Sequence, residues 1–292
     1  MQLQLGLSSD VNLSQVDAEP LLSSRRRPIG TPLLKWPGGK RVLLKHLMQL
    51  LPSHATSYYE PFLGGGALYF ALQTPNSTLS DTNADLINCY CQVRDRPEEV
   101  IALLSTMKNT EEDYYSVRAV TLTDEIARAA RLIYLTTLAF NGIHRLNLHG
   151  QFNVPYGRKT HVNPCDAERI RAASAALSGA ELRSEDFQTA TKDATRGSLV
   201  YFDPPYTVAH GSNGFLKYNS RIFSWSDQVR LSQVAMELSE RGCSVLVSNA
   251  DHPSIHSLYE GFRMIRMTRA SQIAASSQAR RSITEIIFYN EV

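Results

Sequence analysis

The stretch SYYEPFLGGGALYFAL, residues 57–72, decides the fold class. An aromatic run at 57–59 favours a short strand, and Glu60 follows it. The consecutive glycines from Gly64 to Gly66 predict a tight turn, and the apolar run after them predicts a helix. A strand, a turn and a helix in this order open a βαβ unit. The chain is therefore expected to contain a mostly parallel sheet covered by helices.

The same alternation resumes further along the chain. A second strand is expected to end at Asp81, while a helix at 166–177 and a strand at 199–202 restore the pattern after a helical segment. The next helix is expected to have Ser226 as its N-cap and to stop just before Gly242. Two last strands without a helix between them predict an antiparallel hairpin at one edge of the sheet.

The segment between the two sheet halves is mostly helical in pattern. Apolar side chains recur at helical spacing from Ile126 to Thr137, and the pair Asn141-Gly142 is typical of a helix end. The region before the first strand shows no sustained periodicity. The sequence thus predicts three parts: a flexible tail at 1–28, a sheet domain formed by 29–83 and 166–292, and an inserted helical domain at 84–165.

Composition places the chain among ordinary globular proteins. It has 292 residues, 43% hydrophobic and 20% charged, with a net charge of +2 that neither demands nor excludes a nucleic-acid partner. Its 4 cysteines form no C-x-x-C pair, so we expect neither a metal site nor disulfides. No apolar run is long enough to span a membrane, and the N-terminus is too polar for a signal peptide. We expect a cytoplasmic protein.

The glycine cluster does not match either common phosphate-binding pattern. The dinucleotide fingerprint fails because Tyr69 stands at its third glycine. The KWPGGK stretch fails as a phosphate loop because Leu34 and Arg41 stand where that pattern needs Gly and Ser or Thr. An adenosine ligand without phosphates remains, with Asp81 accepting hydrogen bonds from ribose hydroxyls. A purely structural turn is the alternative.

The stretch LVYFDPPY, residues 199–206, places an acid at the end of a buried strand. Ligands of parallel sheets bind beyond the carboxyl ends of the strands, where Asp203 falls. Proline has no N–H, so Asp203 and Pro204 together present only acceptors, which suit the two hydrogens of a nucleobase amine. Tyr206 could stack on the base. The alternative is a simple turn after a strand.

Several motifs, in this order, resemble those of the Dam family of DNA adenine methyltransferases, the D12 class. The resemblance runs from about residue 31 to 290 and implies a Rossmann-like methyltransferase sheet with an inserted helical target-recognition domain. It also implies S-adenosylmethionine (SAM) as cofactor, and transfer of its methyl group to a flipped-out adenine of double-stranded DNA by a monomer. The motifs are KWPGGK (35–40), EPFLGGGALYF (60–70), SDTNADL (80–86), FNGIHRLNLHGQFNVPYG (140–157) and FDPPY (202–206).

The resemblance also implies roles for individual residues. The catalytic motif corresponds to Asp203, Pro204, Pro205 and Tyr206. The cofactor pocket corresponds to Trp36, Lys40, Glu60, Phe62, Gly64, Gly66, Asp81 and Asp203. The positions that contact DNA correspond to Lys35, Phe140, Asn141, Ile143, Arg145 and Pro155, which makes GATC the expected target. Phe140 stands where the family often has Tyr, so stacking is kept and a hydroxyl contact is lost.

Charged residues outside these motifs suggest further DNA contacts. The segment 261–284 contains five arginines and no acid, and we expect Arg280 and Arg281 to bind phosphates, with an ordinary exposed edge hairpin as the alternative. The arginines at 25–27 are either a solvated charge run or an arm that touches phosphate. His144 and His149 depart from the family pattern, and we expect them at the DNA backbone rather than at a metal.

Two other functions remain open from sequence. One is methylation of another planar amino group: cytosine in DNA, adenine in RNA, or a glutamine side chain. The other is a DNA-binding regulator that has kept the fold and lost the chemistry, against which the intact Asp203, Tyr206 and glycine cluster argue.

Overall fold

The computed structural model describes residues 19–20, 31–207, 223–270 and 282–291. The predicted phosphate contacts Arg280 and Arg281 lie outside this range, as do the arginines at 25–27. Most of the predicted tail is also outside it, but Glu19–Pro20 (β1) pairs antiparallel with His54–Ala55 (β2).

The main sheet confirms the predicted α/β architecture. Within the described residues it has seven strands in the order β5-β4-β3-β6-β7-β9-β8. The first five are parallel to one another, whereas β9 is antiparallel to both β7 and β8, so the predicted hairpin lies at the sheet edge. The strands are β3 (Tyr58–Glu60), β4 (Ser77–Ser80), β5 (Glu181–Arg183), β6 (Leu199–Phe202), β7 (Ser244–Ala250), β8 (Arg263–Ala270) and β9 (Ser282–Tyr289).

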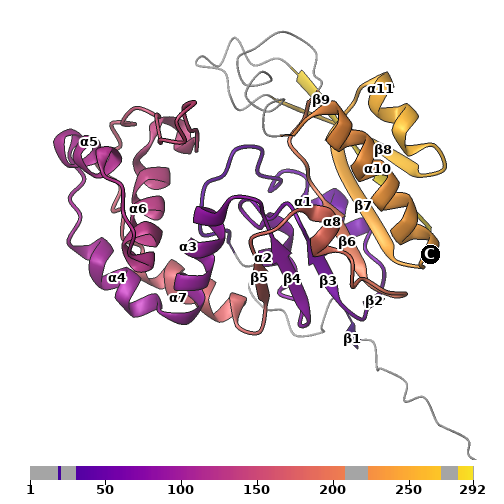
Figure 1. The fold of residues 1–292 in the computed structure, drawn as a ribbon, viewed down its shortest axis with the longest axis horizontal. Helices are drawn as coiled ribbons and strands as arrows, with labels where there is room; N and C mark the ends of the chain where they lie inside the picture. The colour runs from indigo at the N-terminus through magenta and orange to yellow at the C-terminus, as the bar shows by residue number, and fades with distance from the viewer. Residues whose placement is uncertain (1–18, 21–30, 208–222, 271–281, 292) are drawn as a thin grey trace, which may run out of the picture.

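Helices cover the sheet and also build a lobe beside it, seen at the left of Figure 1. In this lobe α3 and α4 pack against α6, and α7 packs against α3 and α4. The helices are α1 (Leu44–Gln49), α2 (Ala67–Leu72), α3 (Ala84–Asp95), α4 (Pro97–Ser105), α5 (Glu111–Ala119), α6 (Glu125–Leu138), α7 (Ala167–Leu177), α8 (Phe187–Ala190), α10 (Trp225–Glu240) and α11 (Pro253–His256), with the 3₁₀ turns η1 (Phe140–Gly142) and η2 (Ser257–Tyr259). None of the described helices is long and apolar enough to cross a membrane.

Side-chain caps explain where several helices begin. The Asn83 side chain accepts hydrogen bonds from the amides of Asp85 and Leu86 at the start of α3. The predicted N-cap of α10, Ser226, is wrong: Ser224 takes this position. Ser224 and Asp227 form a capping box, in which each side chain accepts from the other residue's amide, and only Ser224 has an acid three positions further on.

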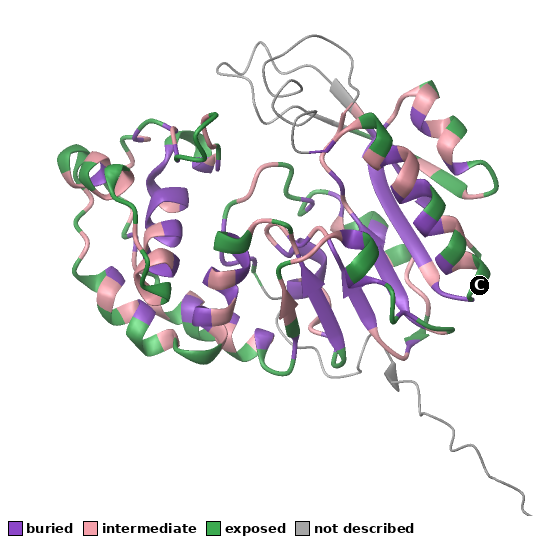
Figure 2. Ribbon diagram, in the orientation of Figure 1, coloured by how far each residue is buried: buried purple, intermediate pink, exposed green. Residues whose placement is uncertain are grey.

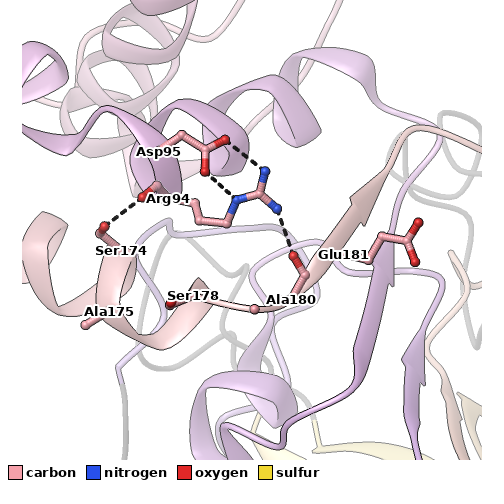
Figure 3. Close-up of a pocket in the computed structure, with 8 residues that line it drawn as sticks. Arg94, Asp95, Ser174, Ala175, Ser178, Ala180 and Glu181 are labelled. Atoms are coloured by element: carbon pink, nitrogen blue, oxygen red, sulfur yellow. Dashed lines mark hydrogen bonds and ion pairs between the residues drawn. The ribbon is translucent and has the colours of Figure 1, made fainter.

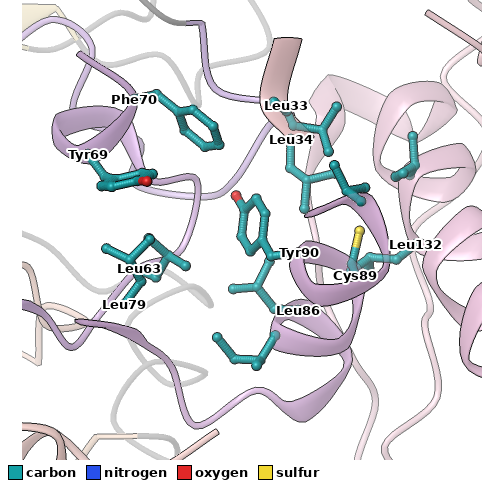
Figure 4. Packing of buried hydrophobic residues seen from close by; sticks show 14 of the residues in the cluster. Leu33, Leu34, Leu63, Tyr69, Phe70, Leu79, Leu86, Cys89, Tyr90 and Leu132 are labelled. Carbon is teal, nitrogen blue, oxygen red and sulfur yellow. The ribbon is translucent and has the colours of Figure 1, made fainter. Parts of the chain in front are cut away.

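The core occupies both faces of the sheet, whose central strands are buried throughout (Figure 2). Because alternate strand residues point to opposite faces, Leu199 and Tyr201 of β6 join one hydrophobic cluster, while Val200 and Phe202 join the other. The first cluster continues through α2 and α3 into the helical lobe, so that sheet and lobe share one core (Figure 4). This shared packing holds the lobe beside the carboxyl ends of the strands.

Candidate active site

Three acidic residues meet at the carboxyl ends of the central strands. Glu60 ends β3, Asp81 follows β4 and Asp203 follows β6. In the sheet, β3 lies between β4 and β6. The chain winds outward from β3 through β4 to β5 and then returns to β6 on the other side. Such a topological switch point is the usual ligand site of an open parallel sheet.

The glycine loop is tied to the acid at the end of β4. The Gly64 amide donates to Asp81 Oδ2 at 3.0 Å, and the Asn83 amide donates to Asp81 Oδ1 at 2.9 Å. Burial raises the pKa of Asp81, and these two backbone hydrogen bonds oppose that rise. On its other side, the Gly64 carbonyl accepts from the Tyr90 hydroxyl at 3.0 Å. The loop is therefore held in one conformation by partners from α3 and β4.

Glycine is required in this loop for two reasons. Gly64 and Gly66 have φ values of +46° and +63°, which favour glycine. A Cβ at Gly64 would also lie 2.9 Å from Cδ1 of Trp36, whose indole covers the loop. Of the predicted cofactor residues, Trp36 therefore contacts the glycine loop. The Phe62 ring instead stacks on Phe187, with ring centroids 5.4 Å apart.

Glu60 is a buried acid at the centre of the site. Its side chain is 2% exposed, and Oε2 accepts hydrogen bonds from the Tyr58 hydroxyl at 2.7 Å and from the Tyr69 amide at 3.1 Å. Burial raises its pKa from 4.5 to about 8, and the charge of nearby Asp203 adds to this rise. The carboxyl is therefore mainly protonated at neutral pH.

Lys40 lies directly against the catalytic motif. Its Nζ is 2.9 Å from Asp203 Oδ1 and donates to the Gly38 carbonyl at 2.8 Å. The same ammonium lies 4.7 Å from the centroid of the Tyr206 ring. The resemblance implied a position in the cofactor pocket, and the structure brings Lys40 onto the acid and the aromatic of the D-P-P-Y motif.

Buried polar side chains that sequence reasoning missed support the motif from behind. The Tyr206 hydroxyl donates to Glu285 Oε2 at 3.3 Å, and Gln228 Nε2 donates to the Pro205 carbonyl at 3.4 Å. Gln228 Oε1 in turn accepts from Asn249 Nδ2 at 3.0 Å. Glu285, Gln228, Asn249 and Pro204 are all buried. An acid inside the apolar strand SITEIIF was a signal that could have found Glu285, since buried acids need a partner.

The predicted DNA contacts gather on one segment of the lobe. Phe140 is 47% exposed, and Asn141 is exposed with φ +53°. The Phe140 amide donates to the Pro155 carbonyl at 2.9 Å, which closes the segment 140–157. The exposed Arg145 donates through Nε to Asn153 Oδ1 at 2.8 Å.

Lys35 and the segment 140–157 are in contact although they are distant in sequence. A Cβ at Gly142 would lie 2.7 Å from Cδ of Lys35, so the two chains meet closely. Ile143 is half-buried, and Pro155 and Lys35 are exposed. The structure therefore brings Lys35 against the segment 140–157, which contains the other five predicted DNA contacts.

The expectation for His144 is wrong. Its side chain is buried, and its ring stacks on Trp36 with centroids 4.5 Å apart. Burial lowers its pKa to about 4, so the ring is neutral. This histidine is not at the surface because its ring packs in an apolar stack between the KWPGGK segment and the lobe. His149 is exposed.

The arginines of β8 that the structure describes have acidic neighbours. Arg263 is paired with Glu291 at 2.6 Å and Arg266 with Asp251 at 3.2 Å. Both arginines are exposed, so these pairs leave them accessible at the sheet edge.

An open cavity of about 660 Å³ lies elsewhere, between the ends of α3 and α7 and the edge strand β5 (Figure 3). Its polar groups satisfy one another: Arg94 binds Asp95 and the Ala180 carbonyl, and Ser174 donates to the Arg94 carbonyl. None of the predicted site residues lines it. In the described part of the chain, no three His, Cys, Asp or Glu side chains are grouped as a metal site.

The doubly wound sheet, with a glycine loop after β3 and Asp-Pro-Pro-Tyr after β6, defines a Rossmann-like methyltransferase fold. Comparison with known families then assigns the chain. Residues 36–273 match the model described as D12 class N6 adenine-specific DNA methyltransferase, and the chain belongs to this family. The predicted family and enzyme class are thereby confirmed.

Curated relatives agree with this assignment along most of the chain. The type II methyltransferase M1.LlaDCHI of Lactococcus lactis subsp. cremoris is 39% identical over 269 residues, 89% of this chain and 95% of its own. The type II methyltransferase M.MjaIII of Methanocaldococcus jannaschii is 31% identical over 284 residues, 89% of this chain and 98% of its own. The DNA adenine methylase of Escherichia coli K12 is 31% identical over 260 residues, 87% of this chain and 93% of its own.

Proposed function

We propose that this methyltransferase transfers the methyl group of SAM to N6 of the adenine in GATC, after that adenine has been flipped out of double-stranded DNA. It acts as a cytoplasmic monomer. The observation that carries the proposal is the corner at 203–206, where Asp203 and two prolines present acceptors at the sheet switch point, with the Tyr206 ring beside them. Adenine N6 carries two hydrogens, which such a corner can accept.

The residues at the strand ends fit SAM. The glycine loop carries no side chains beside Asp81, and Asp81 Oδ1 and Oδ2 retain acceptor capacity beyond their two backbone hydrogen bonds. Asp203 supplies a carboxylate for a positively charged ligand, and the buried, neutral Glu60 lies near it. When bound, the cofactor supplies a methyl group on a positively charged sulfur. No covalent bond between DNA and protein is then needed.

The protein's own groups orient the nucleophile. Asp203 and the Pro204 carbonyl accept the two N6 hydrogens, which favours a lone pair directed away from the ring plane and stabilises positive charge developing on nitrogen. Lys40 Nζ lies 2.9 Å from Asp203 Oδ1 and helps to hold the carboxylate in place. The cysteines support direct transfer: Cys89 is fully buried, and burial raises the pKa of both its thiol and that of Cys243.

The exposed recognition segment supports the target. Arg145 and Lys35 are the side chains suited to guanine O6 and N7, and an Arg–guanine pair contributes about 1–3 kcal/mol of discrimination. The exposed Phe140 ring can fill the gap left by the flipped adenine. Flipping costs a few kcal/mol, which stacking on Tyr206 roughly offsets at about 1–3 kcal/mol per base. Phosphate contacts must then supply much of the net affinity.

The test is to express the protein in a host free of DNA methylation and to locate modified adenines by sequencing plasmid DNA. Modified adenine within GATC is the expected result, and modification in another context would overturn the target. Asp203→Ala should lower the turnover number by at least about 100-fold while DNA binding persists. Asp193→Ala, a change at an exposed acid of the same half of the chain, is the matched control and should leave turnover unchanged. Near-normal turnover of Asp203→Ala would contradict the assigned role.

A further inference from the structure

A stack of rings joins the recognition segment to the cofactor loop. The rings of Trp36 and His144 are nearly parallel, with an interplanar angle of 19° and centroids 4.5 Å apart. Phe152 meets the other side of His144 edge-on at 5.6 Å. Trp36 belongs to the KWPGGK segment, whereas His144 and Phe152 both belong to the recognition segment 140–157. The stack thus bridges two functional segments that are far apart in the chain.

Trp36 also packs against the glycine loop. The positions that a Cβ would take at Gly64 and Gly65 lie 2.9 Å and 3.4 Å from atoms of Trp36. Gly64 is in turn bonded to Asp81. A displacement of the indole would therefore also displace the glycine loop and Asp81, because close-packed groups transmit displacement.

His144 is well suited to hold this indole. It is 8% exposed, and burial keeps its ring neutral by lowering its pKa to about 4. The contact is therefore an interaction between two neutral flat rings. A phenylalanine has a ring of similar size and needs no hydrogen-bond partner, so it should perform the same task.

We propose that His144 is a positioning residue that holds the Trp36 indole against the glycine loop, so that cofactor binding and DNA binding by this enzyme are coupled through the Trp36–His144 stack. The inference rests on the proposed function, because it takes the glycine loop as the SAM site. It adds a role for a residue that touches neither the reacting nitrogen nor the methyl group.

The experiment measures the dissociation constant of SAM by calorimetry, with and without a GATC duplex, for the full-length protein. In the wild type the duplex should tighten SAM binding. His144→Ala should weaken SAM binding in the absence of DNA by roughly two- to tenfold, the range expected for one aromatic pair. It should also bring the ratio of the two dissociation constants closer to one. His144→Phe should restore both values.

Two further variants separate positioning from simple packing. His161→Ala changes an exposed histidine outside the recognition segment and should leave both dissociation constants unchanged. His144→Leu fills the buried volume without a flat ring, and it replaces His144→Ala if that variant does not fold. It should behave like His144→Ala.

The proposal is overturned if wild-type SAM affinity does not depend on the duplex. It is equally overturned if His144→Leu binds SAM as the wild type does, or if His144→Phe is as impaired as His144→Leu. These outcomes are distinct from failure of the proposed function, which would appear as a wild-type protein that neither binds SAM nor methylates GATC.

Discussion

Glu60 should make the enzyme less stable as pH rises through neutrality, and Glu60→Gln should remove this dependence. The carboxyl is buried, and both of its hydrogen-bond donors, the Tyr58 hydroxyl and the Tyr69 amide, act on Oε2. In the protonated form, Oε1 can carry the proton while Oε2 accepts from both donors. Glutamine reproduces this arrangement with its carbonyl oxygen and never becomes charged.

The magnitude follows from the shift in the pKa of Glu60 from 4.5 to about 8. Below pH 4.5 the group is protonated in both the folded and the unfolded state, so it adds no pH dependence there. Between that value and about 8 only the folded state holds the proton, so the free energy of unfolding falls by about 1.4 kcal/mol per pH unit. The whole interval corresponds to about 5 kcal/mol.

The assay is urea denaturation of the wild type and of Glu60→Gln at pH 5, 6, 7 and 8. The free-energy difference between the two proteins should grow in favour of the variant by about 1.4 kcal/mol per pH unit. Glu112→Gln, a change at an exposed acid, should follow the wild type at every pH. Parallel pH profiles for the wild type and Glu60→Gln would refute the reasoning, since they would show that Glu60 titrates alike in both states.

Three further changes probe the catalytic motif, the recognition segment and the packing beneath it. Glu285→Ala should lower turnover roughly tenfold because the Tyr206 hydroxyl loses its hydrogen-bond acceptor; in a double-mutant cycle this effect should vanish in the Tyr206→Phe background, and additive effects would argue against the contact. Arg145→Ala should reduce the preference for the guanine of GATC by about 1–3 kcal/mol. The preference is measured by comparing kcat/KM on GATC duplexes and on duplexes with one altered base pair. An equal fall in kcat/KM on all duplexes would instead assign Arg145 to the phosphates. Gly157→Ala should lower the free energy of unfolding by about 1–3 kcal/mol in urea denaturation, because its Cβ would lie 2.8 Å from the carbonyl oxygens of Leu138 and Ala139; an unchanged midpoint would show that the backbone there yields freely.

Local patterns were sufficient for the elements that carry the site. The run at 57–72 predicted β3, the glycine turn and α2, and the run at 199–206 predicted a strand that ends at Asp203. The hairpin of β8 and β9 followed from the lack of a helix between them. Such patterns work because strand and helix periodicity and turn chemistry depend on neighbours in the chain. The motif order was also enough to identify the family.

Contacts between distant segments were beyond the reach of these patterns. The sequence shows that His144, Glu285 and Gln228 exist, but not that they are buried or which side chains they meet. Their partners are Trp36, Tyr206 and the Pro205 carbonyl, respectively. Even the nearest of these pairs, Gln228 and Pro205, is separated by 23 positions in the chain. Periodicity cannot report a partner at that separation.

By itself, the sequence determined the family and predicted which residues hold chemistry: the acceptors of Asp203 and Pro204, a glycine loop with acids beside it, and a recognition segment at 140–157. Only the tertiary structure decided how they are held, with Lys40 on Asp203, Glu60 kept neutral, and Trp36 clasped between the loop and His144. The physical reason is that burial sets the charge and orientation of a polar side chain, and burial depends on segments that meet only when the chain folds.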